Sequence, residues 1–163
     1  MLKKLSITAL ALAAAGMATA APAAAQYREK IANDMGECRA DSGPAVMVTV
    51  SGIKASSGTL RIQSYRATSA EWLKKGRWIN RIEAPARSGT MTFCLPMPAA
   101  GSYGIAVRHD LNANGKTDIS QDGGGMSNNP SINIFNLGKP SVDKTAFSVG
   151  NAVKTIRIQM KYM

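Results

Sequence analysis

SYGIAVRHDLNANGKTD, residues 102–118, joins the clearest strand pattern in the second half of the chain to its most ordered loop pattern. From Ser102 to His109, apolar side chains alternate with small or charged ones, and a period of two predicts a half-buried β-strand. The residues expected on one face of this strand are Tyr103, Ile105, Val107 and His109. The loop at 110–118 that follows is where acidic and amide side chains recur at fixed spacing, so it is the first candidate site.

This loop places oxygen-bearing side chains at its positions 1, 3, 5 and 9, with Gly115 at position 6. The order matches the first part of the calcium-loop pattern D-x-[DN]-x-[DN]-G, in which alternate side chains turn inward and position 7 offers its carbonyl. The predicted ligands are Asp110, Asn112, Asn114, Lys116 and Asp118. Position 12 is Gln121 and not the bidentate Glu, so the expected calcium affinity is weak, ~10⁻⁴ to 10⁻³ M.

The same loop also fits a turn without metal. Asn114-Gly115 is a strong turn dipeptide, because both residues tolerate positive φ. Asp and Asn side chains also cap turns by bonding to nearby backbone groups. The sequence therefore leaves two hypotheses open, a weak calcium site and a purely structural turn.

Alternating patterns recur along the chain, with Gly and Pro between them and no long helical period. The segments expected as strands are Val46–Val50, Leu60–Tyr65, Arg77–Ile82, Thr90–Leu95, Ser102–His109, Thr145–Val149 and Val153–Tyr162, with a further brief strand or coil around Ile132–Phe135. The first two are expected to form a hairpin, one or two helical turns to follow Ser69, and the Gly-rich segment 122–129 to be irregular. This pattern predicts an all-β fold, an antiparallel β-sandwich of about seven strands with one short helical insertion.

Residues 1–25 have the features of a secretory signal peptide. Lys3 and Lys4 precede an apolar run, and Ala23-Ala24-Ala25 supplies small residues before a cleavage point at Gln26. No other apolar stretch approaches the ~20 residues of a membrane span. The predicted organisation is a signal peptide at 1–25, a polar arm at 26–44 and one β-sandwich domain at 45–163, in a bacterial periplasm or outside the cell.

Two cysteines follow the predicted cleavage point, Cys38 and Cys94. In an oxidising compartment an even pair predicts a disulfide, here closing a loop of about 56 residues. Such a bond would stabilise the fold by roughly 4 kcal/mol in the chain-entropy model. A thiol nucleophile is the alternative.

The chain is basic, with a formal net charge of +10. Loss of Lys3 and Lys4 with the signal leaves 18 basic and 10 acidic residues, a net charge of +8. A basic and aromatic segment is a candidate for ligand binding, and its residues are Trp72, Lys74, Lys75, Arg77 and Trp78. It could attract an anionic glycan, a lipid or an envelope protein, whereas nucleic acid is excluded outside the cytoplasm. The alternative is a solvated basic surface beside two tryptophans that fill a small core.

No catalytic arrangement is recognisable in the sequence. His109 is the single histidine, and neither a G-x-S-x-G elbow nor zinc-ligand spacing occurs. Neighbouring strand residues point to opposite faces, so Asp110 is poorly placed to orient His109 as a base. A non-catalytic protein is therefore expected.

Two motifs carry a family resemblance. The segment from Leu95 to Val107 resembles the L-P-x-G-x-Y entry strand of transthyretin-like (prealbumin-like) sandwiches. The H-D-x-N-x-N-G-x-x-D loop, followed by Ser127-Asn128-Asn129, resembles the secreted bacterial family catalogued as domain of unknown function 2141. The resemblance covers Val46 to Met163 and implies a secreted Greek-key sandwich of the transthyretin or immunoglobulin type. It implies no activity. Gln121 to Gly125 replaces a run that usually supplies a Glu in that family.

Two non-catalytic functions are therefore expected. The first is a structural or accessory domain of the cell envelope, and the alternative is a binding module that uses the segment from Trp72 to Arg81. Buried tryptophans favour the structural domain, and exposed tryptophans favour the binding module.

Overall fold

The computed structural model describes residues 27–132 and 138–162. The predicted signal peptide and most of the brief strand expected around Ile132–Phe135 lie outside the described residues. None of the helices in the part that is described is long and apolar enough to cross a membrane.

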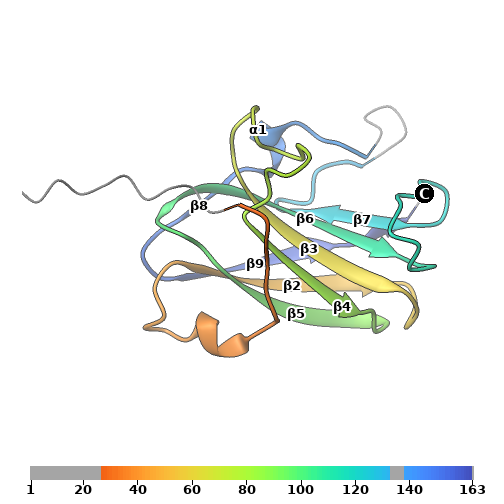
Figure 1. The fold of residues 1–163 in the computed structure, drawn as a ribbon, viewed down its shortest axis with the longest axis horizontal. Coiled ribbons are helices and arrows are strands. Elements are labelled where there is room, and N and C mark those ends of the chain that lie inside the picture. The colour runs from red at the N-terminus through yellow and green to blue at the C-terminus, as the bar shows by residue number, and fades with distance from the viewer. Residues whose placement is uncertain (1–26, 133–137, 163) are drawn as a thin grey trace, which may run out of the picture.

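The described residues form two facing β-sheets (Figure 1). The larger sheet has the order β1-β4-β3-β6-β7-β10, with β8 also paired to β6, and the smaller has the order β5-β2-β9. The strands of the larger sheet are β1 (Glu29–Lys30), β3 (Thr59–Arg66), β4 (Asn80–Pro85), β6 (Gly101–Asp110), β7 (Gly123–Met126), β8 (Phe147–Val149) and β10 (Lys161–Tyr162). The strands of the smaller sheet are β2 (Ala45–Ile53), β5 (Gly89–Pro96) and β9 (Val153–Gln159). A 3₁₀ turn, η1 (Met35–Cys38), and a short helix, α1 (Val142–Thr145), complete the described elements.

The all-β sandwich is confirmed, and its core follows the predicted alternation. Every second residue of β2, namely Val46, Val48 and Val50, is fully buried between the sheets. Leu60 and Ile62 of β3 face them in the same core cluster. Most pairings are antiparallel, but β1 runs parallel to β4 and β9 runs parallel to β2. Three short strands, β1, β7 and β10, account for the difference from the expected seven.

The expected hairpin of the first two strands is wrong. β2 pairs with β5 and β9 in the smaller sheet, whereas β3 pairs with β4 and β6 in the larger one. The connection between them passes from one sheet to the other, with Gly52 and Gly58 at positive φ. Because both strands have one apolar face, burying them against each other across the sandwich satisfies the pattern as well as a hairpin would.

The Gly-rich segment expected to be irregular contains β7. Gly123 and Gly125 lie against the side chains of Tyr162 and Ile158, so close that an added Cβ would clash with each. The missing side chains therefore allow β7 to be a strand while the ring of Tyr162 from β10 and a methyl group of Ile158 from β9 pack onto it.

Two further boundaries differ from expectation. The helical turns expected after Ser69 are reduced to hydrogen-bonded turns, including one from Trp72 N to Thr68 O at 2.9 Å, and the φ of 54° at Leu73 prevents a longer helix. The last predicted strand is divided at Met160, since β9 belongs to the smaller sheet and β10 to the larger. This division lets one segment contribute to both layers.

The polar arm at the start of the described chain joins the edges of both sheets (Figure 1). Its strand β1 pairs with β4. The amide of Asn33 then pairs with the backbone of β5, accepting from Cys94 N at 2.9 Å and donating to Thr92 O at 3.0 Å. The predicted disulfide between Cys38 and Cys94 is present and fastens η1 to β5. The arm thereby covers one open side of the sandwich.

Candidate functional site

Asp110 ends β6, and its carboxylate holds the loop that follows. The side chain is 3% exposed. It accepts hydrogen bonds from the backbone N–H groups of Asn114 at 3.2 Å and Gly115 at 2.8 Å, and from the guanidinium of Arg108 at 3.1 Å. Both carboxylate oxygens thus have donors within the chain.

The remaining predicted ligands bond mainly to one another. Asn112 Oδ1 and Asn114 Oδ1 accept from backbone N–H groups two residues ahead, as in Asx turns. Their amide nitrogens both donate to Asp118 Oδ2, at 3.1 and 2.8 Å. These two bonds, that from Asn112 first, lower the pKa of the Asp118 carboxyl from its ordinary value.

Asp122, which the calcium pattern leaves out, braces the loop from its far end. One oxygen accepts from Leu111 N at 3.2 Å and the other from Asp118 N at 2.9 Å. The side chain is 6% exposed. The calcium pattern requires a carboxylate at Gln121, and Asp122 lies one residue further on. The role of Asp122 is therefore visible only in the folded loop.

The loop oxygens fit a cation poorly in this arrangement, because most of them already face N–H donors. Within the described residues, no three His, Cys, Asp or Glu side chains converge as a metal-binding group would. Lys116 contributes an exposed cation beside Asp118. The calcium site stays a prediction, and the structural-turn hypothesis explains the hydrogen bonds that are observed.

His109 is fully buried, and its ring braces the neighbouring strands. Its Nε2 lies 2.8 Å from the carbonyl of Ser57, so this nitrogen carries the proton. Its Nδ1 lies 2.7 Å from the hydroxyl of Tyr162, which in turn accepts from Lys54 N at 3.0 Å. Each of these polar atoms has a partner in the fold, and a substrate has no access to the ring.

The two tryptophans of the predicted ligand-binding segment are buried at 7% exposure each. With Tyr65 and Met126 they form a second small core on the outer face of the larger sheet. Trp72 packs edge-on against Tyr65, with ring centroids 5.4 Å apart, and its Nε1 donates to the carbonyl of Pro140 at 2.9 Å. Stacking of these rings on a ligand would require this small core to repack.

The basic part of that segment lies apart from the tryptophan rings. Lys74, Lys75 and Arg77 are exposed, and the Arg77 guanidinium lies 5.5 Å from the ring of Tyr27. Arg81 covers the Trp78 ring at 4.1 Å, as a cation on an aromatic face. The structure therefore keeps the cations of this segment accessible and places its aromatic rings inside.

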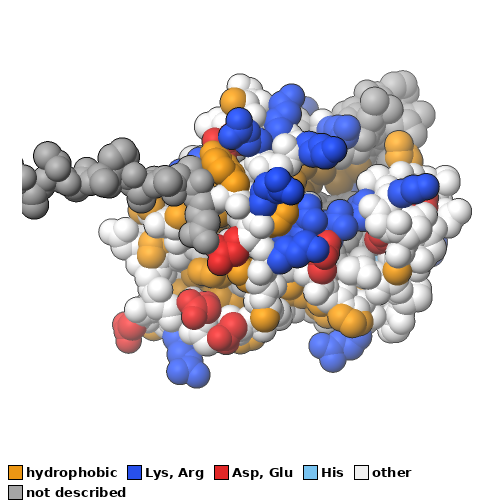
Figure 2. Space-filling view, viewed as in Figure 1, with side chains coloured by type: hydrophobic (Ala, Val, Ile, Leu, Met, Phe, Trp, Pro, Cys, Tyr) orange, Lys and Arg blue, Asp and Glu red, His pale blue; other side chains and the backbone are white. Residues whose placement is uncertain are grey.

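The register of the larger sheet reveals a second group of cations that the sequence did not show. Along one row of neighbouring strands, the paired residues are Glu83, Arg61, Arg108, Gly124 and Lys161, from β4, β3, β6, β7 and β10. We call Arg61, Arg108 and Lys161 the cation row. Figure 2 shows Lys and Arg side chains gathered over β3, β6 and the turns beside them. The three cations are far apart in sequence, so only the register brings them together.

The cation row is only partly neutralised, because its nearby carboxylates are shared among several cations, and Arg108 pairs with Asp110 at 3.1 Å. Arg61 forms an ion pair with Glu83, from Nε to Oε1 at 2.7 Å, and Lys30 reaches the other oxygen of the same carboxylate at 3.3 Å. Burial lowers the pKa of Arg108, and repulsion by Arg61 lowers it further. The pKa of Arg81, in the adjacent row, is lowered by the same two causes. The single carboxylate of Glu83 therefore forms ion pairs with Lys30, Arg61 and Arg81.

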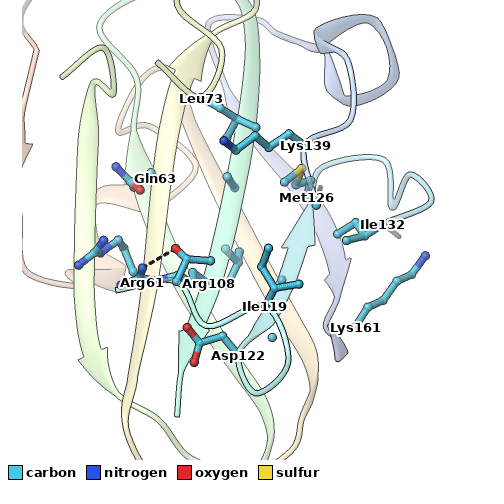
Figure 3. A pocket seen from close by; sticks show the side chains of 16 residues that line it. Arg61, Gln63, Leu73, Arg108, Ile119, Asp122, Met126, Ile132, Lys139 and Lys161 are labelled. Atoms are coloured by element: carbon cyan, nitrogen blue, oxygen red, sulfur yellow. Dashed lines mark hydrogen bonds between the residues drawn. The ribbon is translucent and has the colours of Figure 1, made fainter. Parts of the chain in front are cut away.

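A groove lies beside the cation row, with a volume of about 250 Å³. Figure 3 shows Arg61 and Gln63 on one side of this groove, Met126 and Ile132 on the other, and Ile119 between them. Its floor is the outer face of β6 and β7, including Gly124. The groove is therefore apolar inside, and the charged residues that line it are four cations, Arg61, Arg108, Lys139 and Lys161, and one carboxylate, Asp122.

The comparisons with known proteins give one match. A family profile described as "Uncharacterized protein conserved in bacteria (DUF2141)" matches residues 48–157, which include most of β2, all of β3 to β8, the loop and most of β9. No curated protein and no solved structure matches the chain.

Proposed function

This chain belongs to the bacterial family DUF2141, and we propose that it is a non-catalytic, extracytoplasmic domain that binds an anionic ligand on the outer face of its larger sheet. The observation that carries the proposal is the cation row. Arg61 and Arg108 are directly paired across β3 and β6. Like charges at directly opposite positions destabilise a sheet, so a fold that keeps them there gains from an anion between or above them.

The local charge balance supports an anionic ligand. The nearby carboxylates are Glu83, which Arg61, Lys30 and Arg81 share, Asp110, which forms an ion pair with Arg108, and Asp122, whose oxygens accept from the backbone of the loop. Within residues 27–132 and 138–162, Arg61 pairs with Glu83 through Nε alone, which leaves its two Nη groups for a ligand. A partly desolvated guanidinium binds a carboxylate or phosphate more strongly than a fully hydrated one.

The disulfide supports the proposed compartment. Cys38 and Cys94 form a bond that persists in oxidising compartments such as the periplasm. This observation supports the predicted signal peptide indirectly, and mass spectrometry of the protein exported from a bacterial host would test cleavage before Gln26.

The proposed function can be tested by NMR titration with two small anions, inorganic phosphate and acetate. We expect saturable shifts of the Nε–H signals of Arg61 and Arg108 and of the amides around Gly124. Arg61→Gln should abolish these shifts. The matched control is Lys154→Gln on the smaller sheet, which removes the same charge from an exposed position and should leave them unchanged. Equal responses in both variants would mean that only net charge attracts the anion, and the proposal would be rejected.

A structural or accessory domain of the envelope is the second candidate. The observation that favours it is the burial of Trp72 and Trp78. This candidate predicts that neither phosphate nor acetate produces saturable shifts at the cation row.

Calcium binding remains a separate hypothesis for the loop. With an affinity of ~10⁻³ M, about 5 mM calcium would stabilise the protein by about 1 kcal/mol through mass action. A rise of Tm with calcium but not magnesium, lost in Asp118→Asn, would support the site. An unchanged Tm would leave the metal-free turn.

A further inference from the structure

The groove beside the cation row differs from an ordinary charged surface because its interior is apolar. The apolar residues that line it include Ala106, Ile119, Met126 and Ile132. Ile119 is 46% exposed, and only it and Met35 are large apolar side chains so exposed within the described residues. An apolar hollow with a cationic rim is complementary to a molecule that carries both an apolar body and a negative charge.

Gly124 gives an independent indication that the hollow is kept open. Its neighbours Gly123 and Gly125 are required by packing, because an added Cβ would lie 2.4 Å from Tyr162 and 2.7 Å from Ile158. A Cβ at Gly124 would meet nothing nearer than Ile132 Cδ1 at 3.8 Å, an ordinary contact. Packing therefore does not explain this glycine. A side chain there would instead project from the outer face of β7 into the groove.

The free groups at the rim favour a single negative charge. The Arg108 guanidinium already donates through its two Nη groups, to Thr117 at 2.8 Å, to Asp110 at 3.1 Å and to the carbonyl of Gly115 at 3.2 Å, and its buried Nε has no partner among the described residues. Arg61 is left with both Nη groups, a fork that matches the two oxygens of one carboxylate. Gln63 follows it on the same face of β3 and lines the same groove.

We propose that this groove binds a small amphiphilic carboxylate, of the size of a medium-chain fatty acid, with its carboxylate on Arg61 and its chain over Gly124. The volume of about 250 Å³ lies just below the range of sites for drug-sized ligands, roughly 300–1,000 Å³, which limits the apolar body to a short chain. This inference rests on the proposed function and specifies the ligand of the same face.

The test compares four probes by calorimetry: octanoate, acetate, octanol and inorganic phosphate. Octanoate has both parts of the ligand, acetate and phosphate have only a charge, and octanol has only the chain. Burial of two methylenes already contributes about tenfold in affinity, so octanoate should bind at least tenfold more tightly than acetate. It should also bind at least tenfold more tightly than octanol, because octanol cannot pair with Arg61.

The variants separate the two halves of the site. Gly124→Val fills the groove with a residue that suits a strand and should weaken octanoate binding at least tenfold. Gly150→Val is its matched control, since Gly150 is exposed, has open space around it and lies outside the groove. Arg61→Gln should weaken octanoate but not octanol. If Gly124→Val does not fold, Ile119→Ser on the exposed loop replaces it and should weaken octanoate in the same direction.

The outcomes distinguish the inference from the proposed function. If octanoate binds no more tightly than acetate, or binds Gly124→Val and Ile119→Ser as it binds the unmodified protein, the amphiphile is wrong. The anion-binding function would still stand if phosphate and acetate shift the Arg61 signal. If none of the three anions shifts it, both are wrong.

Discussion

Asp110 is the single side chain on which the loop after β6 depends most. Its buried carboxylate accepts from two backbone N–H groups and one guanidinium. In Asp110→Asn the negative charge is lost and an amide N–H₂ faces one of these donors. Removal of a charged hydrogen-bond partner from a buried site costs about 2–3 kcal/mol, so we expect that loss in the free energy of unfolding, measured with urea. Asp41→Asn, at an exposed position in the arm, is the matched control and should change little.

Tyr162 and Tyr65 make the stability of the protein depend on alkaline pH. Burial is the largest cause that raises the pKa of each phenol above its ordinary value of 10.0. As pH rises above 10, the unfolded chain therefore releases these protons before the folded one and gains stability relative to it. The contribution of both residues is complete below pH 10 and is lost as pH rises through the folded pKa values.

Urea unfolding between about pH 8 and about pH 11.5 checks this prediction, and the absorbance of tyrosinate is recorded in parallel on the same samples. We expect constant stability up to about pH 9.5 and a steady decrease above pH 10. Tyr162→Phe should flatten the decrease. The absorbance of the native protein should show late-titrating phenols, and ionisation of all tyrosines at the ordinary pKa would contradict the assignment.

At the scale of the elements, two asparagines protect the edges of the smaller sheet. Asn33 pairs with the backbone of β5, as described above, and Asn129 does the same for β9, donating to Arg157 O at 3.0 Å and accepting from Gln159 N at 2.7 Å. Exposed strand edges are sites of aggregation, so these amides satisfy groups that another chain could otherwise pair with. The Ser127-Asn128-Asn129 motif thereby acquires a structural role.

Asn129→Ala tests this edge protection. It removes two hydrogen bonds from β9, which we expect to lower the free energy of unfolding by about 2 kcal/mol and to increase light scattering on mild heating. Asn151→Ala, in the exposed turn before β9, serves as the control. If Asn129→Ala neither loses stability nor aggregates more than the control, the amide is not needed at that edge.

The elements that the sequence predicted best are those with one apolar face. β6 and β9 follow the alternation closely, because burial on one side leaves a readable period of two. β7 was missed because three glycines carry no hydrophobic pattern, and its strand geometry depends on partners supplied by β6 and β10. The pairing of β2 was also missed, because alternation states which face is buried but not which strand lies beside it.

At the scale of the whole molecule, the sequence also does not show which strands are neighbours, and this explains which parts of the candidate site could be predicted. The loop at 110–118 is continuous in sequence and was found, whereas Arg61, Arg108 and Lys161 belong to three strands and meet only through the register. Trp72 and Trp78 stand out in the sequence beside a group of cations, but their neighbours Tyr65 and Met126 come from other parts of the chain. Local chemistry is therefore readable from the sequence, while a surface assembled across strands requires the fold.

The disulfide acts at this largest scale, because it fastens the arm that bridges both sheets. The arm is held by β1 on the larger sheet and by Asn33 and the Cys38–Cys94 bond on the smaller one. The bond spans a sequence separation of 56 residues, and the chain-entropy model then predicts a loss of about 4 kcal/mol when it is absent. We expect reduction with dithiothreitol to lower the urea midpoint correspondingly.

The double variant Cys38→Ser with Cys94→Ser separates the bond from the reagent. It should match the reduced protein in stability and should not respond to dithiothreitol. Because β1 and the Asn33 contacts remain, the sandwich should still fold, and only the arm should become sensitive to limited proteolysis. If the double variant is as stable as the oxidised protein, the arm is held by its hydrogen bonds alone, and the disulfide has no structural role across the two sheets.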